Sequence, residues 1–327
     1  MRAMTLWAVA VALAAPVAGQ DGQRRRPMEP KYGEKTGFVP LCDMEEKAQH
    51  RGEDGGLYGG GKNEPPAAHQ EAAKKAAESI RPLDAEGNPA AEGKIVLVSI
   101  GMSNTTQEFS AFMKMAARGK PDRLVIVDGA QGGQAAIQWD TAEARPWGEL
   151  ERRLQAAGVT PRQVQVAWIK QALIAQGQHG EFPAHARKLQ EELAKIVRIA
   201  RARFPNLRIA YLSSRIYAGY ARSNLNPEPY AYEGAFSVRW LIQDQIKGAK
   251  ELNADPGGGE VTAPVLLWGP YLWADGVNPR KCDGLVWKET DLGKDGTHPS
   301  QDGKEKVAQL LLKFFRSDPT SKPWFAP

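Results

Sequence analysis

The sequence predicts an α/β protein, in which three layers (α/β/α) surround a five-stranded, largely parallel sheet. From residue 94 onward, short apolar runs alternate with longer stretches of helical periodicity. The apolar runs are continuous and do not alternate with polar residues, as expected for parallel strands that helices cover on both faces. The 327 residues suffice for one large domain or two small ones.

Each predicted element follows from these patterns. Strands are predicted at residues 95–100, 124–127, 164–169, 207–212 and 264–268. Helices are predicted at residues 67–80, 106–117, 147–157, 184–203, 235–252 and 301–316. Residues 20–92 are rich in Gly, Pro and charged residues, which favours an irregular N-terminal arm, disordered before about residue 35. The remainder, residues 93–327, is predicted to be a single domain.

The N-terminus has the pattern of a signal peptide covering residues 1–19. Arg2 precedes an apolar stretch at residues 6–17, and Val17, Ala18 and Gly19 fit a small-x-small cleavage site. The alternative is a retained membrane anchor, although the apolar run is short for a bilayer span. We therefore expect a secreted or periplasmic protein without integral membrane association. The net charge is +5, and Lys and Arg are mixed with Glu and Asp, which argues against a nucleic-acid partner.

The chain has two cysteines, Cys42 and Cys282. Export to an oxidising compartment favours a disulfide between them, and the alternative is two free thiols. They lack the local CxxC spacing of a zinc site. The histidines His69, His179 and His185 also lack metal-ligand spacing and are expected at the surface. No metal and no cofactor are predicted.

Three residues have the types and positions of a serine hydrolase site. Ser103 directly follows the first predicted strand, while Asp295 and His298 precede the last helix. A serine hydroxyl needs a base to take its proton, and a carboxylate can hold that imidazole in the correct tautomer. Ligands of parallel sheets bind at the carboxyl ends of the strands, which would place both segments at one edge. The alternative is an ordinary turn at Asp295 and Gly296 followed by a helix start capped by Ser300.

These motifs resemble the SGNH hydrolase superfamily, the GDSL-like esterases, over residues 93–317. The first family block, a strand followed by Gly-Asp-Ser, is present as Gly101, Met102 and Ser103. Met102 replaces the usual Asp, and Asn104 follows, which is similar to the Gly-Gln-Ser-Asn start of carbohydrate acetylesterases. The final block, Asp-x-x-His, matches fully. The resemblance implies a flavodoxin-like fold and a Ser/His/Asp mechanism that needs no cofactor.

The resemblance also implies an oxyanion hole made in part by the amide of Ser103. The second block contributes a glycine amide, for which Gly132 is the best match and Gly133 the next. The third block should supply an Asn after the third strand, but the sequence there contains Lys170 and Gln171. Either the amide of Gln171 or the charge of Lys170 could replace the missing Asn.

The sequence gives fewer indications of the substrate. Arg215, Tyr217 and Tyr230, together with Lys170, are candidate substrate contacts, and further aromatic residues could form platforms for sugar rings: Trp268, Tyr271 and Trp273. The alternative is that these aromatic residues pack in the core or in loops. No long apolar lid of the kind expected in a lipase is evident.

The predicted function is an exported serine esterase that removes a small acyl group, acetyl above all, from a carbohydrate or similar polar ester. One alternative is a hydrolase acting on lipids or thioesters, or an acyltransferase, on the same fold. Another is a carbohydrate-binding protein that has lost activity, since the oxyanion Asn is missing.

Overall fold

The central feature is a five-stranded sheet in the order β4-β3-β5-β6-β7, and every neighbouring pair is parallel. A computed structural model describes residues 29–326, so the predicted signal segment lies outside the described residues. The strands are β3 (Ile95–Gly101), β4 (Leu124–Asp128), β5 (Val164–Lys170), β6 (Ile209–Ser213) and β7 (Val265–Trp268). A small antiparallel pair in the arm joins β1 (Gln49–His50) to β2 (Glu53–Asp54).

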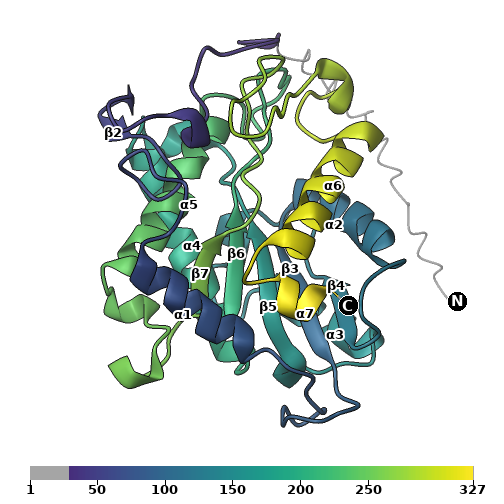
Figure 1. Cartoon of the computed structure of the whole chain (residues 1–327). Coiled ribbons are helices and arrows are strands. Elements are labelled where there is room, and N and C mark those ends of the chain that lie inside the picture. Colours follow the sequence, from purple (N-terminus) through teal and green to yellow (C-terminus); the bar gives the residue numbers. More distant parts are fainter. Residues whose placement is uncertain (1–28, 327) are drawn as a thin grey trace, which may run out of the picture.

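Helices cover both faces of the sheet (Figure 1). One layer holds α1 (Ala67–Glu78), α2 (Ser103–Ala116), α6 (Gln301–Ser317) and α7 (Lys322–Phe325), linked through the α2–α6, α6–α7 and α1–α7 contacts. The other layer holds α3 (Arg145–Ala156), α4 (Ala184–Arg203) and α5 (Tyr230–Ile246), with α4 packed on α5. Short 3-10 helices lie in the connections: η1 (Leu41–Asp43), η2 (Ala136–Trp139), η3 (Pro161–Gln163), η4 (Gln176–His179), η5 (Lys250–Leu252), η6 (Pro256–Gly258) and η7 (Glu289–Asp291).

The strands are the core of the protein. Every residue of β3, β5, β6 and β7 is buried, as expected for parallel strands covered on both faces. The predicted three-layer α/β/α fold with a five-stranded parallel sheet is therefore confirmed. It is also the fold that the resemblance to SGNH hydrolases implies.

The largest difference from the predicted boundaries is at α5. The helix begins at Tyr230, five residues before the predicted start, and ends at Ile246. The aromatic and polar residues at its start resemble a loop in sequence, but Tyr232 is fully buried and packs on Trp273 with ring centroids 4.7 Å apart. Tertiary packing therefore extends the helix beyond its apolar periodic region.

The N-terminal arm is irregular, as predicted, but its described part is bound to the core by hydrogen bonds. Gly33 donates to the carbonyl of Gly219 at 2.9 Å, so order begins before residue 35. The carboxylate of Asp275 accepts hydrogen bonds from the backbone N–H and the hydroxyl of Thr36 at 2.6 and 2.7 Å. Among the described residues, no helix combines the length and apolar character needed to cross a membrane.

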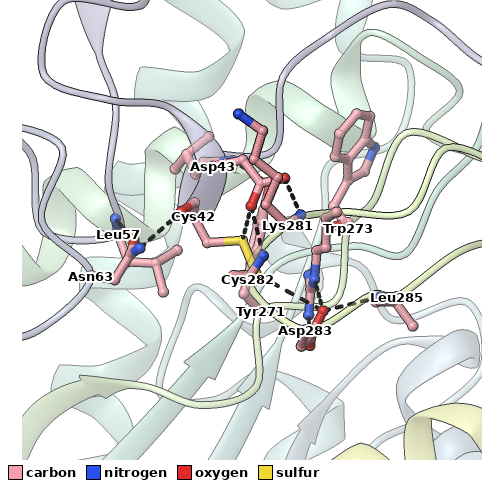
Figure 2. The surroundings of a disulfide bond; sticks show 12 residues. Cys42, Asp43, Leu57, Asn63, Tyr271, Trp273, Lys281, Cys282, Asp283 and Leu285 are labelled. Carbon is pink, nitrogen blue, oxygen red and sulfur yellow. Dashed lines mark hydrogen bonds and ion pairs between the residues drawn. A yellow bond between two sulfur atoms is a disulfide. The ribbon is translucent and has the colours of Figure 1, made fainter.

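A disulfide joins the arm to the loop that follows β7. Cys42 and Cys282 are bonded across 240 residues of sequence, with their Cα atoms 6.2 Å apart. Figure 2 shows the carboxylate of Asp43 beside the bond, accepting hydrogen bonds from the backbone N–H groups of Lys281 and Cys282 at 2.7 and 3.0 Å. The arm and the loop are thus held by both covalent and polar contacts.

We expect the double substitution Cys42→Ser and Cys282→Ser to lower the free energy of unfolding by about 2–4 kcal/mol, because the bond closes a long loop of the unfolded chain. Denaturant titration of both proteins measures this difference. Mass spectrometry of non-reduced peptides checks the pairing, and finding both thiols free in protein from an oxidising compartment would contradict it.

Candidate active site

The candidate site lies where the strand order reverses. β3 sits between β4 and β5, so the connections that leave β3 and β4 run to opposite sides and open a crevice at the carboxyl end of β3. Ser103 is the first residue of α2, two residues after this strand ends. The turn needs glycine at position 101, because a Cβ there would lie 2.5 Å from the carbonyl oxygen of Lys170 on the neighbouring strand. The close approach of the two strands thus places Ser103 at the crevice.

The structure brings Ser103, His298 and Asp295 together. The hydroxyl of Ser103 lies 2.8 Å from Nε2 of His298, and Nδ1 of His298 lies 2.6 Å from Oδ2 of Asp295. The imidazole is 27% exposed and Ser103 is partly exposed, so both can be reached from solvent. Met102 precedes the helix as its N-cap, and the hydrogen bond of the Ser103 hydroxyl is the one to His298. Its hydroxyl is therefore directed at the histidine.

The loop that carries Asp295 and His298 has a fixed backbone. The N–H of Gly293 donates to the carbonyl of His298 at 2.7 Å, and the N–H of Arg222 donates to the carbonyl of Asp295 at 2.9 Å. Gly296 adopts φ +62°, and a Cβ there would collide with the carbonyl of Tyr220. Only glycine tolerates both the positive φ and the close carbonyl. The turn that the sequence offered as an alternative is therefore present, and it also shapes the site.

The environment of Asp295 favours its charged form. Burial raises the pKa of this carboxyl, but hydrogen bonds from the His298 side chain and from the N–H groups of His298 and Thr297 outweigh burial, and the net pKa is lowered. A depressed pKa means that the contribution of Asp295 to stability is present above the pKa of the unfolded chain. That contribution is lost as the pH falls through the lower folded value.

The carbonyl of Thr297 is held by two buried side chains, one on α2 and one in the segment after β6. The amide of Asn104 donates to it at 2.9 Å, and the guanidinium of Arg215 donates to it at 3.3 Å. Asn104 adjoins Ser103 and Thr297 adjoins His298, so this contact fixes the distance between the two segments. Arg215, a predicted substrate contact, is buried beneath the loop and supports it from below.

A buried ion pair lies under the site. Lys170 and Glu108 are both fully buried and in contact, and Arg215 is close enough to influence the titration of Lys170. Burial lowers the pKa of Lys170 to about 8 although Glu108 opposes this, and the charge of Arg215 lowers it further. The ammonium of Lys170 is thus directed at Glu108.

The glycine loop after β4 is fixed by Asp128. This carboxylate accepts hydrogen bonds from the hydroxyls of Ser99 on β3 and of Thr106 and Ser110 on α2. Burial raises the pKa of Asp128, and these three hydroxyls partly oppose the increase. The loop beyond it is exposed at Gly132, which has no atom within 4 Å of the position a Cβ would occupy.

Gln171 lies against the same loop. Its Nε2 donates to the carbonyl of Gln134 at 3.4 Å, while its Oε1 is buried without a partner among the described residues. The N–H of Gln131 donates to the carbonyl of Gly101 at 3.0 Å, which holds the loop against the end of β3. The segments that carry Ser103, Gly132 and Gln171 are therefore neighbours.

Other residues singled out in the sequence lie elsewhere. Tyr217 is fully buried, and its hydroxyl donates to the carbonyl of Gly33 at 2.8 Å. Tyr230 is half-buried and packs edge-on against His185 with ring centroids 4.8 Å apart. The three candidate platform residues are buried and belong to the core: Trp268, Tyr271 and Trp273.

The expectation that the histidines lie at the surface is wrong for two of them. His69 is buried and donates to the carbonyl of Leu266 at 2.8 Å, and His185 is buried 2.7 Å from the carboxylate of Glu233. Polar side chains can be buried when each finds a partner, which sequence alone does not reveal. In the described residues, a cluster of metal-ligand types occurs at Cys42, Asp43 and Cys282, where the two sulfurs are already joined to each other.

Sequence reasoning missed three residues that hold the site together: Asn104, Glu108 and Asp128. Two carried a local signal. Asn104 follows the candidate nucleophile, and Asp128 ends an apolar strand at the edge where the site forms. Glu108 carried none, because its partner lies 62 residues away on another element.

No protein-family model matches the chain, and no curated protein matches it. Among solved structures, the chain is similar to a GDSL-like lipase from Bacteroides thetaiotaomicron, with 12% identity and a TM-score of 0.37 over 75% of this chain and 95% of that chain. It is also similar to the periplasmic domain of a lipopolysaccharide acetyltransferase from Salmonella Paratyphi A, with 13% identity and a TM-score of 0.36 over 76% and 96%. A third is a lipase from a goat rumen metagenome, with 13% identity and a TM-score of 0.37 over 67% and 97%.

We expect Asn104→Ala to slow the reaction of Ser103 with a fluorophosphonate probe by about 10-fold or more, because a loosened loop misplaces the histidine. Labelling rates followed by mass spectrometry measure this effect. The control is Asn63→Ala, which removes an exposed asparagine whose amide group also donates a hydrogen bond to a backbone carbonyl, that of Cys42. Equal rates for the two variants, with circular dichroism unchanged, would show that the Thr297 contact does not position the site.

Proposed function

We propose that this protein is a serine esterase. The observation that carries the proposal is the unbroken hydrogen-bond chain from the Ser103 hydroxyl through His298 to Asp295. In the proposed mechanism, Oγ of Ser103 attacks the ester carbonyl while Nε2 of His298 takes the hydroxyl proton. His298 then gives that proton to the leaving alcohol, water cleaves the acyl-serine ester in a second round, and Asp295 stabilises the imidazolium in both.

The negative charge that forms on the carbonyl oxygen needs donors aimed at it. The N–H of Ser103 is at the first turn of α2, where backbone donors lack helical partners and the helix dipole favours an anion. We assign Gly132 as the second donor, because its position is open, and Gln171 as the third. Lys170 is the weaker candidate because its ammonium is committed to Glu108 inside the core.

We further propose that the acyl group is small, with acetyl on a carbohydrate or similar polar ester as the natural case. The similarity of the Ser103–Asn104 start to carbohydrate acetylesterases supports this choice. The signal-like N-terminus and the disulfide support export to an oxidising compartment. The competing outcomes of the experiments are acyl transfer to an acceptor other than water, action on lipid or thioester substrates, and binding without catalysis.

We expect Ser103→Ala and His298→Ala to lower kcat for p-nitrophenyl acetate by orders of magnitude. The first variant lacks the nucleophile and the second lacks its base. Asp295→Asn should lower kcat by a smaller factor, because the backbone of Thr297 and His298 still orients the loop. Initial rates, with circular dichroism as a folding check, measure these effects. A Ser103→Ala variant with wild-type kcat would exclude the assigned nucleophile, and wild-type protein that neither turns over the ester nor takes up a fluorophosphonate would favour a binding protein.

Two substitutions separate the candidate oxyanion donors. Gln171→Ala should lower kcat by about 10²–10³-fold without loss of stability, because one donor is removed. Lys170→Met should instead lower the free energy of unfolding by about 3–5 kcal/mol, since Glu108 is left buried and unpaired. Denaturant titration and initial rates measure both effects.

The matched control is the double variant Lys170→Met with Glu108→Gln, which removes both charges and should recover much of the stability. A large loss of kcat in that double variant, with full kcat in Gln171→Ala, would reverse the assignment of the donor.

A further inference from the structure

A hollow of about 400 Å³ lies between α2 and α6, outside the residues so far assigned to the site. Its α2 wall includes Gln107, Ser110 and Lys114, and its α6 wall includes Gln301 and Lys304. Both helices begin at the catalytic edge, because Ser103 opens α2 and His298 lies three residues before Gln301. We therefore asked whether the hollow continues the active site.

The spacing along α2 places one wall of the hollow on the helix face that begins at Ser103. Ser103, Gln107, Ser110 and Lys114 follow the i, i+4, i+7, i+11 pattern of one helix face. Residues four apart on a helix have Cβ atoms about 5–6 Å apart. Helical side chains in general lean toward the N-terminus, which for Gln107 is the direction of Ser103.

The hollow is lined by polar side chains together with the apolar residues Ala111 and Met115. The side chains of Gln107, Lys114 and Lys304 make no hydrogen bond or ion pair to any described group, so their donors remain available. Gln301 donates to Glu305 at 2.6 Å and retains its own carbonyl as an acceptor. The Ser110 hydroxyl is fixed by Asp128, which keeps this wall in place.

We propose that this hollow binds the alcohol part of the substrate, and that this part carries several hydroxyl groups, as in an oligosaccharide. The inference rests on the proposed esterase function and names the residues that would select its substrate: Gln107 and Gln301 as the principal hydrogen-bonding groups, with Lys114 and Lys304 farther along. Gln301 follows His298 by three residues, and in the proposed mechanism His298 returns its proton to the leaving alcohol, so we assign this side of the site to the alcohol and not to the acyl group. A long alkyl chain would cover these amides and ammonium groups without satisfying them, which is unfavourable.

The test compares two acetyl esters that share an acyl group and differ in the alcohol. One is p-nitrophenyl acetate, whose small leaving group does not extend along the hollow, and the other is a mixture of partially O-acetylated xylo-oligosaccharides. We expect Gln107→Leu and Gln301→Leu each to lower kcat/KM for the oligosaccharides by about 2- to 10-fold, mainly through KM, as loss of one hydrogen bond implies. Rates on p-nitrophenyl acetate should stay within about 2-fold of wild type, because the catalytic groups are untouched.

The matched control is Gln155→Leu, which changes an exposed glutamine of the same kind on α3, on the other face of the sheet. Wild-type protein that cleaves p-nitrophenyl acetate but not the oligosaccharides would overturn the inference. Equal losses on both esters, or no loss on either, would overturn it as well. In each of these cases the esterase function itself would stand.

Binding provides a readout that does not depend on turnover. Calorimetric titration of Ser103→Ala protein with the acetylated oligosaccharides should show binding that Gln107→Leu weakens and Gln155→Leu does not. If the wild-type protein neither cleaves an ester nor reacts with a fluorophosphonate, the proposed function fails. If the oligosaccharides still bind in that case, and Gln107→Leu weakens their binding, the hollow is still supported as a sugar site. If they do not bind, the sugar site is overturned as well.

Discussion

The arrangement of the site depends on one carbonyl oxygen. Thr297 offers its two lone pairs to Asn104 from α2 and to Arg215 from the segment after β6. Asn104 and Thr297 are 193 residues apart in sequence, yet each adjoins one member of the Ser103–His298 pair. A hydrogen bond between exposed side chains would be loose by itself. Here the neighbouring residues fix both backbones, so the contact between Ser103 and His298 is already ordered by its surroundings.

The charges of Lys170 and Glu108 are costly to bury, so neither residue can be replaced alone without leaving its partner unpaired. Lys170 ends β5 with its ammonium on Glu108, while Gln171, the next residue, lies against the glycine loop. β5 ends at Lys170, so Gln171 lies just beyond the strand and its side chain can contact the loop while Lys170 contacts the core. A buried pair of this kind contributes little net stability, but losing one partner leaves the other unpaired. Adjacent residues thus have different environments, since Lys170 pairs with Glu108 in the core and Gln171 bonds to the carbonyl of Gln134.

Local pattern and the positions of the strand ends were enough to predict the sheet and the order of its elements. They were also enough to predict that Ser103 meets Asp295 and His298. Continuous apolar runs fix parallel strands, and parallel strands bring their carboxyl ends to one edge. The surroundings could not be predicted in the same way. Arg215 and Tyr217 are polar or amphipathic residues beyond a strand end, which suggested a pocket rim, but Thr297 and Gly33 supply partners that allow both to be buried. Such partnerships depend on three-dimensional register across the whole chain, which has no sequence signature.

The disulfide has a consequence for the order in which the protein is made. Cys42 is synthesised 240 residues before Cys282, and all five strands of the main sheet lie between them. While the chain is still growing, the first thiol has no native partner, and only a molecule that contains the complete sheet can close the ring. The bond can therefore close only after all five strands have been made, while His298, α6 and α7 still follow Cys282 in the sequence. A fragment that ends before residue 282 would keep an unpaired cysteine in its arm.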